Sequence, residues 1–329
     1  MVGMRGTETQ ARSPVWSRTW FKLSLSVLLL AGLLWKTDLS DLVGAVARAN
    51  PWWVLLALLT YIGSQVVSSI RWTMLARPLG FNDPFSSFFA SYFTGMYFNL
   101  FAPSTVAGDI SRALHLAGTQ RRKSLAFTTV IADRGLGFIV LCWIGALATI
   151  LQPGYRVPPP LWYGAWVVPP ATLLGWLYLP QLVVRMFAPD SRPRRLVERD
   201  VAAYWKDRRL LLQTSAVAAV FHVMQILSQV WLARALGVQV AWPFFFIFVP
   251  VVNILGMLPI SFSGIGIREG GYLFFLGQLG VPRPTAVAIG LLSSAVVLAS
   301  GLAGGAVYLL WRSHPRGRGP LLRSAARDR

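Results

Sequence analysis

Two stretches of the chain repeat one another, and both lie inside long apolar surroundings. Each opens with an asparagine and continues with a proline, a glycine five residues later and an arginine nine residues later. The two sets are Asn99, Pro103, Gly108 and Arg112, then Asn253, Pro259, Gly264 and Arg268, with Gly266 beside the second glycine. Proline and glycine interrupt helices, and backbone groups left unpaired in lipid are costly, so such segments must be buried in protein or line a cavity. Interrupted apolar segments at matching positions in two halves of a chain are typical of a transporter site.

The composition is that of an all-α polytopic membrane protein. Of the 329 residues, 55% are hydrophobic and only 13% are charged, whereas soluble domains carry roughly 25% charged residues. The net charge of +19 comes from basic residues at the ends of apolar segments, which is the positive-inside pattern. No nucleic-acid recognition motif accompanies this charge, so nucleic acid is not an expected partner. One cysteine and three scattered histidines offer no metal-ligand spacing, and we expect no cofactor.

Six apolar segments are predicted to be transmembrane helices. They cover residues 20–35, 52–75, 125–151, 161–184, 210–236 and 286–311. The first is short for a span and has a signal peptide as its alternative, but a retained anchor is favoured because the candidate cleavage site at 45–47 lies far beyond the apolar run. Pro169 and Pro170 are expected to kink or interrupt the fourth span.

The broken segments, residues 85–112 and 243–279, are predicted to be re-entrant hairpins. Basic residues flank the first on both sides, with Arg71 and Arg77 before it and a basic run at 121–123 after it, so both of its ends are expected in the cytoplasm. The second lies between a span that ends outside and a span that starts outside. The two hairpins therefore have opposite orientations and form inverted repeats of about 52–151 and 210–311.

These segments make up a single transmembrane domain over residues 20–312. A basic loop at 185–209 and basic tails at 1–19 and 313–329 are all expected in the cytoplasm. The predicted location is the plasma membrane, with both termini inside.

Ionisable residues at membrane depth are candidate functional residues, because each is costly to bury in lipid. They are Asp109, Arg112, Asp133, Arg134, Arg268 and Glu269. One interpretation is that they form neutral structural networks. The other is an anion site, in which arginines bind phosphate and helices restarting after Gly108 and Gly264 point free N–H groups into a cavity. Asn99 and Asn253 are expected to satisfy backbone groups, and His222 to make an interhelical hydrogen bond.

With these motifs in place, the chain resembles the lysylphosphatidylglycerol synthase transmembrane-region family, also described as flippase-like membrane proteins. The resemblance extends over about residues 20–311. Its motifs are Asn99, Ala102-Pro103, Gly108-Asp109 and Arg112, then Arg134-Gly-Leu, then Pro259 and Gly264-Ile-Gly-Ile-Arg268-Glu269. Two positions depart from the family pattern. Ala107 stands where the family usually has a first glycine before Gly108, and Ser261-Phe-Ser stands where it tends to have Pro-Gly-Gly. These departures leave the predicted fold intact but weaken any inference about the substrate.

The resemblance implies a domain that translocates lipid, which in full synthases serves a separate soluble aminoacyl-transferase domain. Only a short basic tail follows Trp311, so aminoacyl transfer is not expected and the chain is not predicted to be an enzyme. The leading hypothesis is a flippase for a phosphate-bearing lipid, with Arg112, Arg134 and Arg268 contacting the phosphate. No ATP-binding loop is present.

Two other hypotheses stay open. The first is a membrane partner, without transport of its own, that positions or regulates a glycosyltransferase or a lipid-modifying synthase through the 185–209 loop. The second is an enzyme acting on lipid phosphate. It is ranked last because Asp109, Asp133 and Glu269 lie in separate segments and do not form paired acids with metal-ligand spacing. The identity of the lipid, the direction and energy source of its movement, and homo-oligomer formation are left open.

Overall fold

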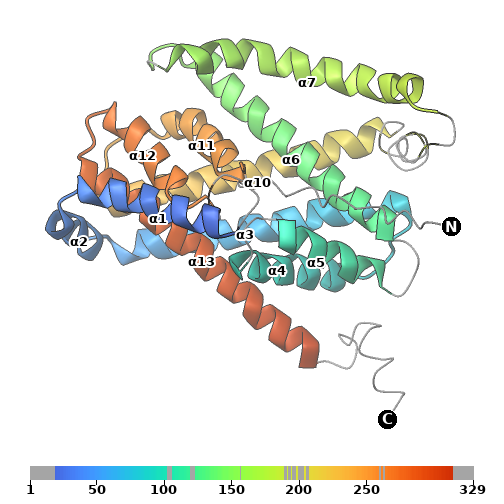
Figure 1. The fold of residues 1–329 in the computed structure, drawn as a ribbon, viewed down its shortest axis with the longest axis horizontal. Helices are drawn as coiled ribbons and strands as arrows, with labels where there is room; N and C mark the ends of the chain where they lie inside the picture. The colour runs from blue at the N-terminus through green and yellow to red at the C-terminus, as the bar shows by residue number, and fades with distance from the viewer. Residues whose placement is uncertain are drawn as a thin grey trace, which may run out of the picture.

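The computed structural model describes residues 19–101, 106–118, 123–155, 157–188, 207–258 and 264–313, and the single positions 191, 194, 198, 204 and 261. Every regular element in these ranges is a helix (Figure 1), which confirms the all-α prediction. Pro103 and Pro259, nearly all of both predicted tails and most of the 185–209 loop lie outside the described residues.

The helices follow one another closely along the chain. They are α1 (Thr19–Trp35), α2 (Leu39–Ala47), α3 (Pro51–Ala76) with the short 3-10 helix η2 (Arg77–Leu79), α4 (Phe85–Phe101), α5 (Val106–Ala117), α6 (Lys123–Leu151), α7 (Pro159–Met186), α10 (Arg208–Ala235), α11 (Trp242–Met257), α12 (Ile267–Gly277) and α13 (Arg283–Ser313). The first broken segment is thus the pair α4 and α5, and the second is the pair α11 and α12.

Within the described residues, four helices are long and apolar enough to cross a membrane, namely α3 with η2, α6, α10 and α13. Helices α1 and α2 add a fifth if they form one span, although they bend by 93° at the break between them. The prediction of a multi-pass membrane protein is confirmed. The predicted count of six spans is not confirmed, because α7 is not one of these four helices in the part of the chain that the structure describes. The helix α7 also runs through Pro169 and Pro170 as one element, so an interruption at these prolines is wrong, whereas the kink given as its alternative stays a prediction.

Helix α13 connects the two broken pairs, because it packs against both α4 and α12. Its glycines allow a close approach to α4: a side chain at Gly304 would meet the Phe93 carbonyl, and one at Gly305 would meet the Tyr97 ring. Small residues of this kind let transmembrane helices pack backbone to backbone. In Figure 1, α13 crosses the molecule from α12 toward α4, whereas α7 lies at the opposite edge beside α6.

Helices α3 and α10 pack side by side and form the other main contact of the fold. Trp53 stacks on Trp231 at a ring separation of 5.3 Å, and the Ser228 hydroxyl donates to the Ala57 carbonyl at 2.8 Å. Helix α3 begins at a strong start signal, since Asn50 caps the Trp52 N–H and proline follows at the first helical position. This packing fixes α3 and α10 as one wall of the cavity described next.

Candidate functional site

A cavity of about 280 Å³ lies where the two broken pairs meet α3, α6, α10 and α13. It brings together most of the residues predicted from the sequence. Those in its lining are Asn99, Gly108, Asp109, Arg112, Asp133, Arg134, Asn253 and Arg268. Glu269, Gly264 and Gly266 are not among the lining residues; the two glycines come just before α12 and Glu269 lies in its first turn.

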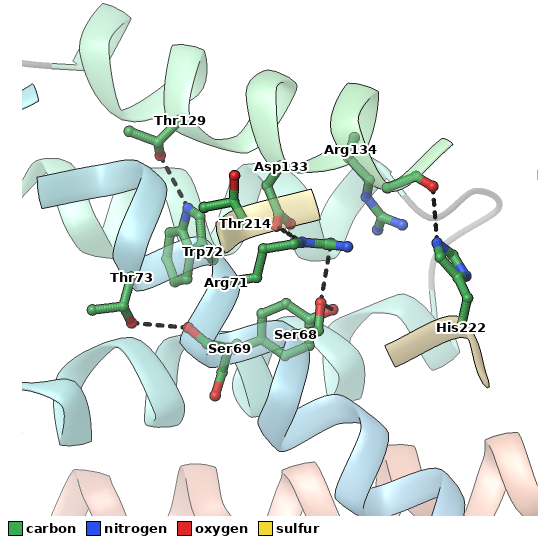
Figure 2. Close-up of polar contacts among 12 residues, drawn as sticks. Ser68, Ser69, Arg71, Trp72, Thr73, Thr129, Asp133, Arg134, Thr214 and His222 are labelled. Carbon is green, nitrogen blue, oxygen red and sulfur yellow. Dashed lines mark hydrogen bonds and ion pairs between the residues drawn. The ribbon is translucent and has the colours of Figure 1, made fainter. Parts of the chain in front are cut away.

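Asp133 is almost completely buried, with 1% of its surface exposed. One of its oxygens accepts from Arg71 Nε at 2.8 Å, and the other accepts from Arg112 Nη1 at 2.9 Å. Each arginine also lies over aromatic rings, Arg112 over Trp72 and Arg71 over Phe221. Figure 2 shows Arg71 between Asp133 and Ser68. A single carboxylate thereby connects α3, α5 and α6.

Asp109 extends this network to Arg134. Arg134 Nε lies 3.1 and 3.0 Å from the two Asp109 oxygens, and its Nη2 lies 3.0 Å from Oδ1. Arg112 Nη2 is 3.2 Å from the same Oδ1, at ion-pair distance. The chain of contacts thus runs from Arg71 through Asp133, Arg112 and Asp109 to Arg134. Three arginines oppose two aspartates, so the network has a net charge of +1.

The start of α5 differs from the sequence-based expectation. The helix begins at Val106, so Gly108 lies within its first turn rather than before it. The Gly108 N–H is not free for a ligand, because Asn99 Oδ1 accepts from it at 2.7 Å. Gly108 also packs directly on the Gly95 carbonyl, where a side chain would clash. Asn99 of α4 therefore bonds directly to the first turn of α5. Asp109 lies in that same turn, where a carboxylate interacts favourably with the positive end of the helix dipole.

The start of α12 is organised by two glycines and a glutamate. Gly264 and Gly266 have φ angles of +79° and +85°, which glycine adopts without strain. Glu269 Oε2 accepts from the Gly266 N–H at 2.7 Å, and its Oε1 accepts from the Ser294 hydroxyl at 2.6 Å. Glu269 is 1% exposed and holds α12 against α13. Glu269 therefore caps the start of α12 and bonds to α13, and it is not part of the cavity lining.

Arg268 is the cavity cation without a carboxylate partner. Its Nη1 donates to Ser294 Oγ at 3.3 Å, and no ion pair joins it to any residue that the structure describes. The side chain is half-buried and belongs to the cavity lining. A cation in this position can accept an anion from the cavity without first breaking an ion pair.

Sequence reasoning missed Arg71, which it used as a marker of the cytoplasmic end of a span. Arg71 is 3% exposed and pairs with Asp133, so it carries no topological information. A signal was present: Gln65, Ser68 and Arg71 recur at helical spacing, which forms a polar face on an otherwise apolar helix. Three of the guanidinium nitrogens in this network, namely Arg71 Nη1, Arg112 Nε and Arg112 Nη2, are buried without a hydrogen-bond partner among the described residues, and Arg112 Nη2 has only its ion-pair contact with Asp109.

His222 makes the interhelical bond expected of it. Its Nε2 lies 2.8 Å from the Gly137 carbonyl of α6 (Figure 2). It also lines the cavity together with Gln225 and Gln229 of the same helix. The part of the chain that the structure describes contains no group of three or more His, Cys, Asp or Glu side chains arranged to hold a metal ion.

An apolar groove of about 470 Å³ adjoins the cavity. Ile110 of α5 and Val130 and Ile131 of α6 are among the residues that line it. The groove shares four residues with the cavity, namely Asp109, Arg134, Phe138 and Met257. The cationic cavity and the apolar groove therefore meet at the Asp109–Arg134 pair.

Comparison with known proteins agrees with this architecture. A family model described as the lysylphosphatidylglycerol synthase TM region matches residues 19–305. A UPF0104 membrane protein of Methanothermobacter thermautotrophicus is 22% identical over 291 residues, covering 78% of this chain and 84% of that protein. One from Methanocaldococcus jannaschii is 26% identical over 159 residues, covering 48% of this chain and 45% of that protein. Glycosyltransferase AglD of Haloferax volcanii is 25% identical over 336 residues, covering 88% of this chain and 53% of AglD. The match thus spans less than half of the M. jannaschii protein and about half of AglD.

Proposed function

The chain belongs to the lysylphosphatidylglycerol synthase transmembrane-region family, and we propose that it is a flippase that moves a phosphate-bearing lipid across the plasma membrane. The observation that carries this proposal is the junction between the cationic cavity and the apolar groove. A lipid needs both environments at once, because its headgroup is anionic and its tails are hydrocarbon.

The charge of the cavity favours an anionic ligand. Arg71, Arg112, Arg134 and Arg268 line it, against Asp109 and Asp133, so four positive charges oppose two negative ones. Uncompensated charge at membrane depth is costly and marks substrate pathways. Arginine also presents a planar fork of donors that matches phosphate. A bound phosphate would therefore offset charge that the protein leaves unbalanced.

We assign the main phosphate contact to Arg268. Two further donors, Arg71 Nη1 and Arg112 Nε, belong to residues of the same cavity lining and are buried without hydrogen-bond partners among the described residues. Hydrogen bonds to charged groups contribute about 1.5–3 kcal/mol each. The lipid tails would lie along the groove of α5 and α6, with Arg134 at the boundary between headgroup and tail.

The proposed topology provides access from both sides. In this arrangement about six spans enclose two re-entrant hairpins of opposite orientation, α4–α5 and α11–α12, within inverted repeats of about 52–151 and 210–311. Both termini lie in the cytoplasm. Each hairpin would open the cavity to one face of the membrane, as in other inverted-repeat transporters. The proposed activity is transport without chemical change, with membrane lipids as the partner and no cofactor.

Reconstitution tests this function. The purified chain is placed in liposomes with lipids that carry a reporter on one acyl chain, and movement between leaflets is followed by chemical quenching from outside. We expect anionic lipids to move faster than in protein-free liposomes made in parallel. Folded protein that accelerates no lipid would rule out the flippase function.

A second candidate is favoured by one comparison, the match to AglD, whose name describes a glycosyltransferase. In this alternative the chain positions or regulates a glycosyltransferase or a lipid-modifying synthase in the membrane, without transport of its own. The proposed contact is the basic loop at 185–209. Neutralising the arginines of this loop would release the enzyme from the chain on co-purification. Retention of the enzyme would exclude the loop as the contact.

A further inference from the structure

The second nitrogen of His222 has no partner in the part of the chain described here. Nε2 faces the Gly137 carbonyl at 2.8 Å, and a carbonyl oxygen can only accept a hydrogen bond. Nε2 of the neutral ring therefore carries the proton, and Nδ1 is left as an acceptor. Nδ1 is buried without a hydrogen bond, in a residue that is 5% exposed and lines the cavity. A buried acceptor of this kind is costly unless a ligand or a water molecule donates to it.

The face of α10 that carries His222 is polar but uncharged, whereas the charged residues near it, Arg71 and Asp133, come from α3 and α6. His222, Gln225 and Gln229 are spaced by three and four residues on α10, so they share one face of the helix, and all three line the cavity. Gln229 Oε1 is a second buried acceptor without a partner among the described residues. This face offers hydrogen-bond acceptors and no carboxylate.

The carboxylates of the cavity are already in use. Asp133 pairs with Arg71 and Arg112, and Asp109 pairs with Arg134 and Arg112. A cationic amine in the headgroup would meet four arginines and would have to displace one of them to reach an acid. Hydroxyl groups carry no charge and donate hydrogen bonds, so they fit the acceptors of α10 without that cost.

From this arrangement we infer that the site takes a phosphate bearing an uncharged polyol, such as glycerol, inositol or a sugar, and that His222 Nδ1 accepts a hydrogen bond from one of its hydroxyls. The inference rests on the proposed function, since it names the headgroup class for the same cavity. His222 thereby has two roles: its Nε2 joins α10 to α6, and its Nδ1 contacts the ligand.

Two conservative substitutions separate these roles. In His222→Gln, the amide nitrogen takes the place of Nε2 and keeps the bond to Gly137, but the acceptor at the Nδ1 position is lost. In His222→Asn, the amide oxygen takes the place of Nδ1 and keeps the acceptor, but the bond to Gly137 is lost. A merely structural histidine would make the asparagine variant the more defective one, whereas a ligand contact makes the glutamine variant more defective in headgroup preference.

The experiment is a lipid-binding titration of the full chain in detergent, followed by native mass spectrometry. The probes share the same acyl chains and are phosphatidylinositol, phosphatidylglycerol, phosphatidylethanol and phosphatidylethanolamine; phosphatidylethanol carries the same single phosphodiester charge as the two polyol lipids but no hydroxyl group. We expect the wild-type chain to bind the two polyol lipids about three- to tenfold more tightly than phosphatidylethanol, which is the ratio one hydrogen bond supports. Phosphatidylethanolamine is expected to bind more weakly than either polyol lipid.

The variants then decide the assignment. His222→Asn should keep the preference for polyol lipids and His222→Gln should lose it, with phosphatidylethanol bound equally by both as the control for folding. Equal binding of phosphatidylethanol and polyol lipids by the wild-type chain would overturn the inference, and so would a full preference in His222→Gln.

Binding in detergent needs no movement across a bilayer, so the two proposals fail separately. A polyol preference in a chain that moves no lipid in liposomes would support the headgroup inference and remove the flippase function. Movement of lipid in liposomes without any preference in binding would do the reverse.

Discussion

The two broken helix pairs have matching sequences but differently paired arginines. Arg112 of α5 is 3% exposed and contacts two carboxylates. Arg268 of α12 stands at the equivalent place, four residues after the matching glycine, yet it is half-buried and bonds only to a serine among the described residues. The same motif thus produces a closed ion-pair network in one half and an unneutralised cation in the other.

The position of the neighbouring acid explains the difference. Asp109 precedes Arg112 by three residues, so both lie on one helix face and share the network with Arg134. Glu269 follows Arg268 directly but makes no ion pair with it; Glu269 accepts from the Gly266 N–H and from the Ser294 hydroxyl, and Arg268 donates to that same hydroxyl. The first pair is therefore expected to hold the fold together, and the second to bind the ligand.

Removing the charge of Asp133 should have the largest effect on stability. In Asp133→Asn, Arg71 and Arg112 remain buried without their shared carboxylate, which is expected to cost about 3–5 kcal/mol. Thermal unfolding of the detergent-purified protein measures the loss, with Arg268→Gln as the matched variant in the other half. Equal unfolding temperatures for the two variants would show that the network does not stabilise the fold more than Arg268 does.

The glycines of the two pairs should also differ. Gly108→Ala places a methyl group against the Gly95 carbonyl and the Asn99 side chain, and backbone cannot move aside easily, so a cost of about 3 kcal/mol is expected. Gly264→Ala meets its nearest atoms at 3.4 Å, in ordinary contact, and pays about 1–2 kcal/mol for its positive φ. Urea or thermal unfolding in detergent compares them. A larger loss for Gly264→Ala would contradict the close packing of α4 on α5.

The two asparagines are expected to give the smallest difference in the free energy of unfolding between the two halves. Asn99→Ala removes the acceptor for the Gly108 N–H and should cost about 1 kcal/mol. Asn253 lines the cavity without a hydrogen bond to any described residue, so Asn253→Ala should change the free energy of unfolding by about 0.5 kcal/mol or less. Matching losses in an unfolding titration would mean that Asn253 caps its own helix break as Asn99 does.

Much of this architecture could be predicted from the sequence, because hydropathy and helix breakers are local signals. The two broken pairs and the meeting of Asp109, Arg112, Asp133, Arg134 and Arg268 at one cavity follow from where costly residues interrupt apolar segments. The partner of each charge does not follow. That choice depends on how neighbouring helices face each other, which the order of residues in one helix does not encode.

Arg71 illustrates that limit. Near the end of a span, an arginine is expected at the cytoplasmic surface, and only the packing of α3 against α6 turns it toward Asp133. The start of α5 is a second case. Glycine is expected to stand before a helix, but Asn99 reaches across from α4 and allows the helix to begin at Val106.

The central claim is that Arg268 is the cation that binds the lipid phosphate while the network around Asp133 is structural. The most direct measurement is the rate of translocation of acyl-labelled phosphatidylglycerol in liposomes containing Arg268→Gln, beside Arg234→Gln, an exposed arginine of α10 outside the cavity lining. We predict a 10- to 100-fold loss for Arg268→Gln, as expected for one charged hydrogen bond of about 1.5–3 kcal/mol, with the unfolding temperature unchanged and Arg234→Gln at the wild-type rate. Wild-type translocation by well-folded Arg268→Gln would contradict the account.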